Sequence, residues 1–188
     1  MTKRKTAGLV GLAAALAEDR EAAFPRLVRA LQDGIYSGVL RLTADRAEAE
    51  DITQEAFLRA YRALGSYPPE RVRELQVREW LWTIALNLCR NQARSRSRHP
   101  AASLTDDPAL SAPGPGPEQA ALAAADRERL AGHLVRLPWA MRASVVLRHV
   151  TGLPYTDIAA VLGRPVGTVK SDVRRGLQRL RRSMEEEP

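Results

Sequence analysis

The chain has little of what several common classes of protein depend on. Its 188 residues contain one cysteine, Cys89, which excludes an internal disulfide and a cysteine-based zinc site. A single thiol is typical of a reduced, cytoplasmic protein, and we expect Cys89 to be a small core residue of a helix. No run approaches the ~20 apolar residues that a membrane span requires, so a transmembrane protein is excluded.

The N-terminus has the basic-then-apolar layout of a signal peptide, with Lys3, Arg4 and Lys5 before an apolar stretch at 7–17. That stretch is mostly alanine and glycine, and a basic chain without cysteine pairs gains nothing from export. We therefore expect residues 1–20 to be an N-terminal extension, whose role the sequence does not assign.

Aromatic residues are also scarce, at 5% of the chain, while charged residues make up 27%. This balance suits small helical bundles built on leucine, alanine and valine better than a β-sandwich, which needs aromatic and β-branched strands. The composition therefore predicts an all-α protein.

A stretch rich in proline and glycine divides the chain. Between about 95 and 118 helical periodicity is lost, while five prolines and two glycines accumulate. This composition predicts a flexible linker, at 98–120, between a first domain at 21–97 and a second at 121–188. At ~3.3–3.6 Å per residue, ~24 residues could span at most ~80 Å, so the two small helical domains need not touch each other.

The first domain has the pattern of three helical regions. Apolar residues from Phe24 to Leu42 recur at helical spacing, which predicts one or two helices. A long helix is predicted from about Asp45 to Leu64, with Gly65 as its C-terminal cap. After a break at the two prolines of the 66–77 loop, helical periodicity resumes from 79 to 94.

The second domain carries a positive face on a helix-turn-helix pattern. A short helix capped by Thr156 is followed by a turn at Gly163 and by a third helix that begins near Val166. The 164–182 segment holds seven basic residues and a single acid, Asp172, within a chain of net charge +7. A plain solvated helix face usually mixes charges of both signs, so this face favours a polyanion as partner.

Three motifs together resemble one family. The C-terminal segment Gly152–Ala159, followed by Leu162-Gly163 and Gly167–Ser171, looks like the DNA-binding domain of extracytoplasmic-function (ECF) sigma factors. Ala49–Arg62 resembles the polymerase-binding helix of that family, and Trp80–Leu88 resembles its promoter-melting helix. The three stand in the family's order across residues ~24–182.

The resemblance implies a non-enzymatic subunit, without metal or cofactor, that binds core RNA polymerase and promoter DNA and has an anti-sigma protein as a candidate regulator. It implies a polymerase-binding face of Asp51, Gln54, Glu55, Leu58, Arg59 and Arg62. It implies contacts with the separated strand of the minus-10 element from Trp80, Thr83, Asn87, Arg90, Asn91 and Arg94. For the minus-35 duplex the residues are Thr168, Lys170, Ser171, Arg174, Arg175 and Arg179, the later arginines together with Arg181 lying over phosphate.

Some residues admit a second interpretation. The charges on the 45–64 helix could form only an intrahelical salt-bridge ladder, and Trp82 could be ordinary core. Asp172, where many relatives carry a basic or neutral residue, could repel phosphate, accept from a cytosine amine or brace an arginine. The 66–77 loop, which helps select a minus-10 base in the family, has no residue with an assigned role.

Two other functions compete with this interpretation. A free-standing helix-turn-helix repressor would explain the second half of the chain but leaves the first half unexplained. A nucleic-acid enzyme would need a carboxylate cluster, a metal site or an activated nucleophile. His99, His133 and His149 share no ligand spacing, and no glycine-rich phosphate loop is present.

Overall fold

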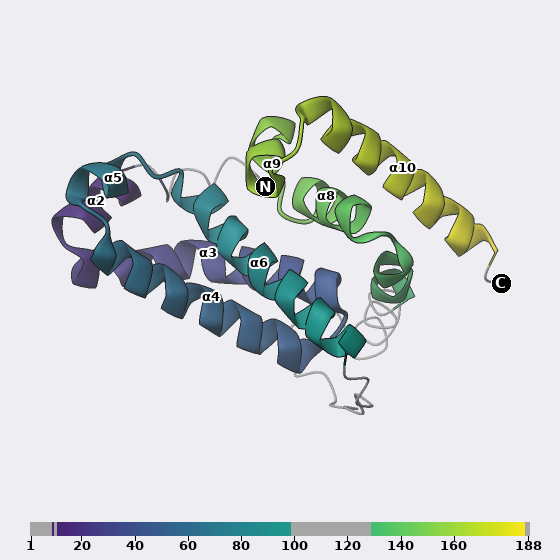
Figure 1. The fold of residues 1–188 in the computed structure, drawn as a ribbon, viewed down its shortest axis with the longest axis horizontal. Helices are drawn as coiled ribbons and strands as arrows, with labels where there is room; N and C mark the ends of the chain where they lie inside the picture. Colours follow the sequence, from purple (N-terminus) through teal and green to yellow (C-terminus); the bar gives the residue numbers. More distant parts are fainter. Residues whose placement is uncertain (1–8, 10, 99–128, 187–188) are drawn as a thin grey trace, which may run out of the picture.

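In a computed structural model, residues 9, 11–98 and 129–186 are described, and every regular element among them is a helix (Figure 1). The all-α prediction is confirmed. Most of the predicted linker, the first eight residues and the start of the second domain up to residue 128 lie outside the described residues. None of the described helices is long and apolar enough to cross a membrane.

The first domain is built on three long helices that pack side by side. They are α3 (Arg20–Thr43), α4 (Arg46–Ser66) and α6 (Val77–Arg98), with the short α5 (Pro69–Arg73) between the last two. Asp19 and Asp45 cap α3 and α4, because their carboxylates accept from the Ala22 and Glu48 amides at 3.0 and 2.9 Å. These caps set where both helices begin.

A further helix, α2 (Leu12–Glu18), lies inside the segment that we expected to be an N-terminal extension. Leu12 and Leu16 are buried, and α2 packs against both α3 and α5. The alanines around them leave room for this close packing. Residues 12–18 are thus part of the first domain.

Gly65 is not the cap that its position suggested, because α4 runs through it to Ser66. A side-chain carbon at Gly65 would collide with the Arg20 guanidinium, which also lies 4.4 Å from the centre of the Tyr61 ring. Glycine at this position therefore makes room for a cation near the carboxyl end of α4, where a positive charge is favourable.

The second domain contains a helical segment at 129–136, then α8 (Trp139–His149), α9 (Tyr155–Leu162) and α10 (Val166–Glu185). Gly163 ends α9 with φ of 62°, a conformation that glycine adopts without strain, and α10 follows at once. The helix-turn-helix is therefore present. Pro154, not Thr156, precedes α9; the Thr156 hydroxyl instead donates to Asp157 (2.9 Å).

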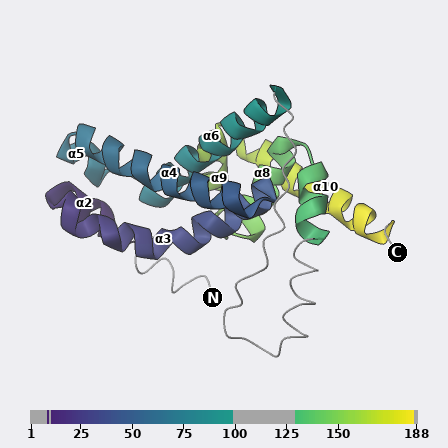
Figure 2. The same ribbon diagram turned by 90° about the horizontal axis from the view of Figure 1, so that it is seen from below.

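The two domains pack against each other, although the linker would allow them to lie apart. The views in Figures 1 and 2 show α8 beside α3 and α9 beside α6, and these helix pairs are in contact. Gly38 of α3 lies where a side-chain carbon would collide with the Trp82 ring and come within 3.2 Å of Thr151 Cγ2. The close approach at Gly38 therefore joins α3, α6 and the second domain.

Candidate nucleic-acid and polymerase interfaces

The outward face of α10 collects the residues predicted to read the minus-35 element. Val169, Val173 and Leu180 are buried against α8 and α9, which turns the opposite side of α10 to solvent. Four side chains line a shallow recess on that side: Lys170, Ser171, Arg174 and Arg175. Arg179 is exposed farther along the helix, and Thr168 is half-buried at its start.

Two of these side chains have local partners. The Ser171 hydroxyl donates to the Gly167 carbonyl oxygen at 3.0 Å, which leaves its lone pairs available to a donor. Lys170 Nζ lies 5.8 Å from the centre of the Tyr155 ring, and Arg148 stacks over the same ring at 4.7 Å. The sequence analysis assigned no role to Tyr155. Its ring holds Arg148 of α8 near Lys170, so a second cation lies at the start of the helix-turn-helix.

Asp172 braces an arginine, which decides among its three interpretations. Its side chain is 8% exposed, and Oδ2 accepts from Arg164 Nη1 at 2.7 Å. A carboxylate on the buried side of α10 cannot reach a base edge. The only acid in the basic 164–182 segment is thus turned inward, so the outward face keeps one sign of charge.

The predicted minus-10 residues form a stripe along α6. Asn87, Asn91 and Arg94 are exposed, while Trp80, Thr83 and Arg90 are half-buried. Trp82 is core, with 1% of its surface exposed. The Thr83 hydroxyl donates to the Glu79 carbonyl oxygen at 3.0 Å. The described part of the stripe therefore offers two amides and two guanidinium groups beside one accessible indole.

An aromatic stack that sequence reasoning missed extends this stripe into the 66–77 loop. The Tyr67 ring lies 6.1 Å from the Trp80 ring at an angle of 59°, and the Arg71 guanidinium covers Tyr67 at 3.8 Å. Both distances fit aromatic and cation–π contacts. The sequence pattern did not indicate this contact, because the prolines at 68 and 69 interrupt the helical periodicity from which a shared helix face is predicted.

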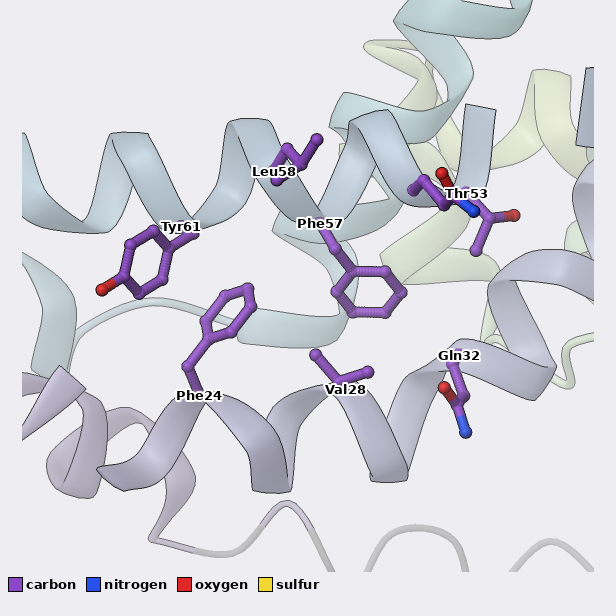
Figure 3. A pocket seen from close by; sticks show the side chains of 8 residues that line it. Phe24, Val28, Gln32, Thr53, Phe57, Leu58 and Tyr61 are labelled. Carbon is purple, nitrogen blue, oxygen red and sulfur yellow. The ribbon is translucent and has the colours of Figure 1, made fainter. Parts of the chain in front are cut away.

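The polymerase-binding face predicted on α4 borders an apolar groove that includes α3. Leu58 is 51% exposed, and Gln54 lies one turn before it on the same side. Figure 3 shows Phe24 and Val28 of α3 opposite Phe57 and Tyr61 of α4. The groove has a volume of about 530 Å³ and is lined by Phe24, Val28, Gln32, Thr53, Gln54, Phe57, Leu58 and Tyr61.

Two of the charged side chains on α4 form an intrahelical salt bridge, as the alternative of a salt-bridge ladder predicts. Glu55 Oε1 and Arg59 Nε are 2.6 Å apart in an i, i+4 pair whose side chains are both well exposed. Asp51 and Arg62 are exposed on the same helix. One pair of the ladder is therefore formed, and Leu58 and the groove remain beside it.

The described residues contain no group of three or more His, Cys, Asp or Glu side chains placed to hold a metal ion. Cys89 is buried, as expected, and burial raises the pKa of its thiol to about 12, helped by the negative charge of Glu48. Such a thiol stays protonated and is a poor nucleophile.

Comparison with known proteins identifies the family. Residues 27–99 match the family Sigma-70 region 2, and residues 127–180 match Sigma-70, region 4. A sigma-H factor of Pseudomonas aeruginosa is 33% identical over 87% of this chain and 86% of its own length. The ECF sigma factor SigW of Bacillus subtilis is 31% identical over 86% of this chain and 89% of SigW. The chain belongs to the ECF sigma factor family.

Other relatives of the ECF family extend the comparison. SigE of Mycolicibacterium smegmatis is 37% identical over 86% of this chain, which spans only 62% of SigE. Among solved structures, CnrH in complex with the cytosolic domain of CnrY has the same fold, with a TM-score of 0.71, 23% identity and coverage of 94% of this chain and 97% of that one. The sigma factor RpoE of Bartonella quintana, bound to the anti-sigma factor NepR, has a TM-score of 0.68 with 23% identity over 88% and 98%.

Proposed function

We propose that the protein is a sigma factor that binds core RNA polymerase and directs it to promoters by reading a minus-35 duplex and holding a melted minus-10 strand. The observation that carries this proposal is the presence of three different surfaces on one chain. A helix-turn-helix alone would suit a repressor, but the α6 stripe and the groove between α3 and α4 would then have no use.

The α10 face has the chemistry for duplex DNA. Arg174 and Lys170 are donors on the outward side of the recognition helix, and such donors pair with guanine O6 and N7 in the major groove. Arg175, Arg179 and Arg181 lie on or after the same turns and suit phosphate. A helix with this distribution reads bases near its start and holds the backbone later.

The α6 stripe has the chemistry for single-stranded DNA. Single strands are bound by cationic grooves with aromatic surfaces on which bases stack, at about 1–3 kcal/mol per base. Trp80 and Tyr67 supply the aromatic surface, and Arg90 and Arg94 supply charge. We include Tyr67 and Arg71 among the residues that meet the melted strand.

The groove between α3 and α4 suits a helix of the polymerase. An exposed leucine beside an apolar channel with two amide side chains, Gln32 and Gln54, accepts an amphipathic helix better than it accepts DNA. We assign polymerase docking to this groove together with the six α4 residues predicted from the sequence.

The decisive experiment reconstitutes transcription from a genomic library with core polymerase and maps the start sites. A sigma factor yields starts that share two upstream elements and binds the promoter strongly only with core. Strong binding of duplex DNA by a dimer without core would support the repressor instead.

Control by a separate anti-sigma protein is a second part of the proposal. It is supported by the fold shared with RpoE, which was solved with its anti-sigma factor NepR. Co-purification of a partner that releases the chain when core is added would support it. As a transcription subunit without enzymatic activity of its own, the protein would act in the cytoplasm.

A further inference from the structure

The outward row of α4 carries opposite charges at its two ends. The row consists of Asp51, Glu55, Leu58 and Arg62, which are separated by four, three and four positions and so share one side of the helix. Its first half is acidic, an exposed leucine stands near its middle, and an arginine ends it, with Arg59 beside it. A row in this order is complementary to a reversed copy of itself.

The groups at the middle and at both ends of this row are available to a partner. Glu55 and Arg59 pair with each other, whereas neither Asp51 nor Arg62 forms an ion pair with another described residue. Leu58 is 51% exposed, and in Figure 3 its side chain points away from Phe24 of α3. The domain therefore leaves one large apolar side chain and two charges of opposite sign unused.

The spacing of these groups fits an antiparallel pair of α4 helices from two copies of the chain. The 21 residues of α4 make a helix about 30 Å long, which is long enough to pair along its whole length. Asp51 and Arg62 stand equally far from a point midway between Ala56 and Phe57. A two-fold axis through this point places Asp51 of each copy opposite Arg62 of the other.

The centre of such a pair is also complementary. At 1.5 Å rise per residue, the two copies of Leu58 lie about 4.5 Å apart along the helix direction, which allows contact between them. Glu55 of one copy lies within about 1.5 Å of the level of Arg59 of the other. A parallel pair in register would instead place Asp51 against Asp51 and Arg62 against Arg62, and like charges disfavour it.

The size of this contact suits a reversible association. One helix from each copy, with the side chains that border it, covers less than the about 1,600 Å² of a standard protein–protein interface. The same face of α4 is the one that we assign to core polymerase. A second copy on this face would therefore occupy the surface that the polymerase needs.

We propose that the free protein forms a reversible antiparallel homodimer through α4, in which Leu58 packs against Leu58 and Asp51 of each copy pairs with Arg62 of the other. Because the dimer covers the docking face, the chain binds core polymerase only as a monomer. This second statement rests on the proposed function, whereas the self-association rests on the α4 face alone.

A charge exchange between two variants tests the pairing. Asp51→Arg and Arg62→Asp each create two like-charge contacts in a symmetric dimer, so each variant alone should lose at least about tenfold in self-association. An equal mixture of the two variants should recover it, because each arginine of one chain then meets an aspartate of the other. Sedimentation equilibrium between about 1 and 100 μM measures the average mass. The matched control is Glu74→Arg, an exposed acid outside α4, which should dimerise normally.

Other results of this experiment contradict the dimer. An unchanged protein that stays monomeric over the whole concentration range would overturn the proposal. Self-association that survives both single reversals would place the contact on another surface. Loss in both variants without recovery in the mixture would show that Asp51 and Arg62 do not meet across the two-fold axis.

A cysteine near the axis tests the direction of the helices. Leu58→Cys should form an intermolecular disulfide under mild oxidation, and the native Cys89 is buried. Glu50→Cys is an exposed control on the same helix, and in the antiparallel pair its two copies would lie about 20 Å apart, too far for a bond. Crosslinking of Glu50→Cys in preference to Leu58→Cys would contradict the antiparallel pairing.

Native mass spectrometry of the dimer mixed with core polymerase tests the competition. We expect complexes with one copy of the chain per core and a matching loss of free dimer. Complexes that contain two copies would overturn the competition between the second copy and the polymerase. Failure of core to bind any copy, with self-association intact, would instead contradict the proposed function.

Discussion

Asp172 Oδ2 lies 2.7 Å from Arg164 Nη1, and this ion pair ties the turn of the helix-turn-helix to α10. The carboxylate is almost fully buried and the guanidinium is about one-third exposed. The pair therefore sets the position of α10 relative to α9, while the outward side of α10 carries no acid before Glu185.

Removal of Asp172 should affect stability more than base preference. Asp172→Ala leaves the Arg164 guanidinium without its buried partner, and we expect the free energy of unfolding to fall by about 1–3 kcal/mol in urea titrations. Adding Arg164→Ala should cost less than the sum of the two single changes. A changed preference at one base of the minus-35 element, with stability intact, would show that Asp172 reads DNA after all.

Alanine substitutions at Arg174 and at Arg179 should impair DNA binding in different ways. Arg174→Ala should remove up to about 1–3 kcal/mol of discrimination at one base position, since this residue lies in the recess near the start of α10. Arg179→Ala should weaken binding to all sequences and reduce the salt slope by about one unit. A base-by-base promoter scan at two salt concentrations distinguishes these two effects. If both variants lose affinity equally for every sequence, α10 binds DNA only through its charge and does not read bases.

The α6 stripe should act on promoter opening. Arg90→Ala with Arg94→Ala should slow opening more than it weakens initial duplex binding, because these charges meet the strand only after it separates. Permanganate footprinting over time measures the melted bases. Arg29→Ala serves as control for the loss of positive charge, and unchanged melting in the double variant would remove this stripe from the minus-10 site.

Leu58 should be required for docking on core polymerase but not for folding. Leu58→Asp places a charge at the edge of the apolar groove, and about half of this side chain is exposed, so the domain should stay folded. We expect binding of core to fall at least about tenfold in a pull-down with purified polymerase. Normal binding by Leu58→Asp, or by the charge reversal of Asp51 and Glu55, would place the docking surface elsewhere.

Glu79 should make stability depend on pH. Burial, then the Asp157 charge, raise its pKa above the ordinary value of 4.5 in the folded protein. Between 4.5 and the raised pKa the folded chain holds a proton that the unfolded chain has lost, so stability falls as the pH rises through this window. Arg78 is the cation that opposes this shift.

Glu79→Gln should therefore be more stable than the unchanged protein at pH 7, and this advantage should disappear below pH 4.5, where Glu79 is protonated in both states. Denaturation of both proteins across this pH range measures the difference. A constant difference at every pH would mean that the side chain acts through packing and not through its charge.

Much of the fold was predictable because the determining signals are local. The helical period of Val169, Val173 and Leu180, and the glycine at 163, are enough to place a recognition helix after a tight turn. The α6 stripe is likewise a property of one helix. Gly65 and Thr156 were misinterpreted because a residue type that often caps a helix does not by itself fix where the helix ends. The α4 helix continues past Gly65 to Ser66, and Thr156 lies inside α9, where its hydroxyl donates to the neighbouring Asp157.

The sequence by itself determined the helices, their polar and apolar faces, and the positive charge of the outward face of α10. Only the tertiary structure decided that Asp172 pairs with Arg164, that Val28 of α3 joins Leu58 at one groove, and that Arg142 meets Leu42 in the other domain. Periodicity reports which residues share a face of one helix, and it carries no information about which distant segment covers that face. A long linker allows many arrangements of the two domains. In this structure, side-chain packing and hydrogen bonds between the domains select one of them.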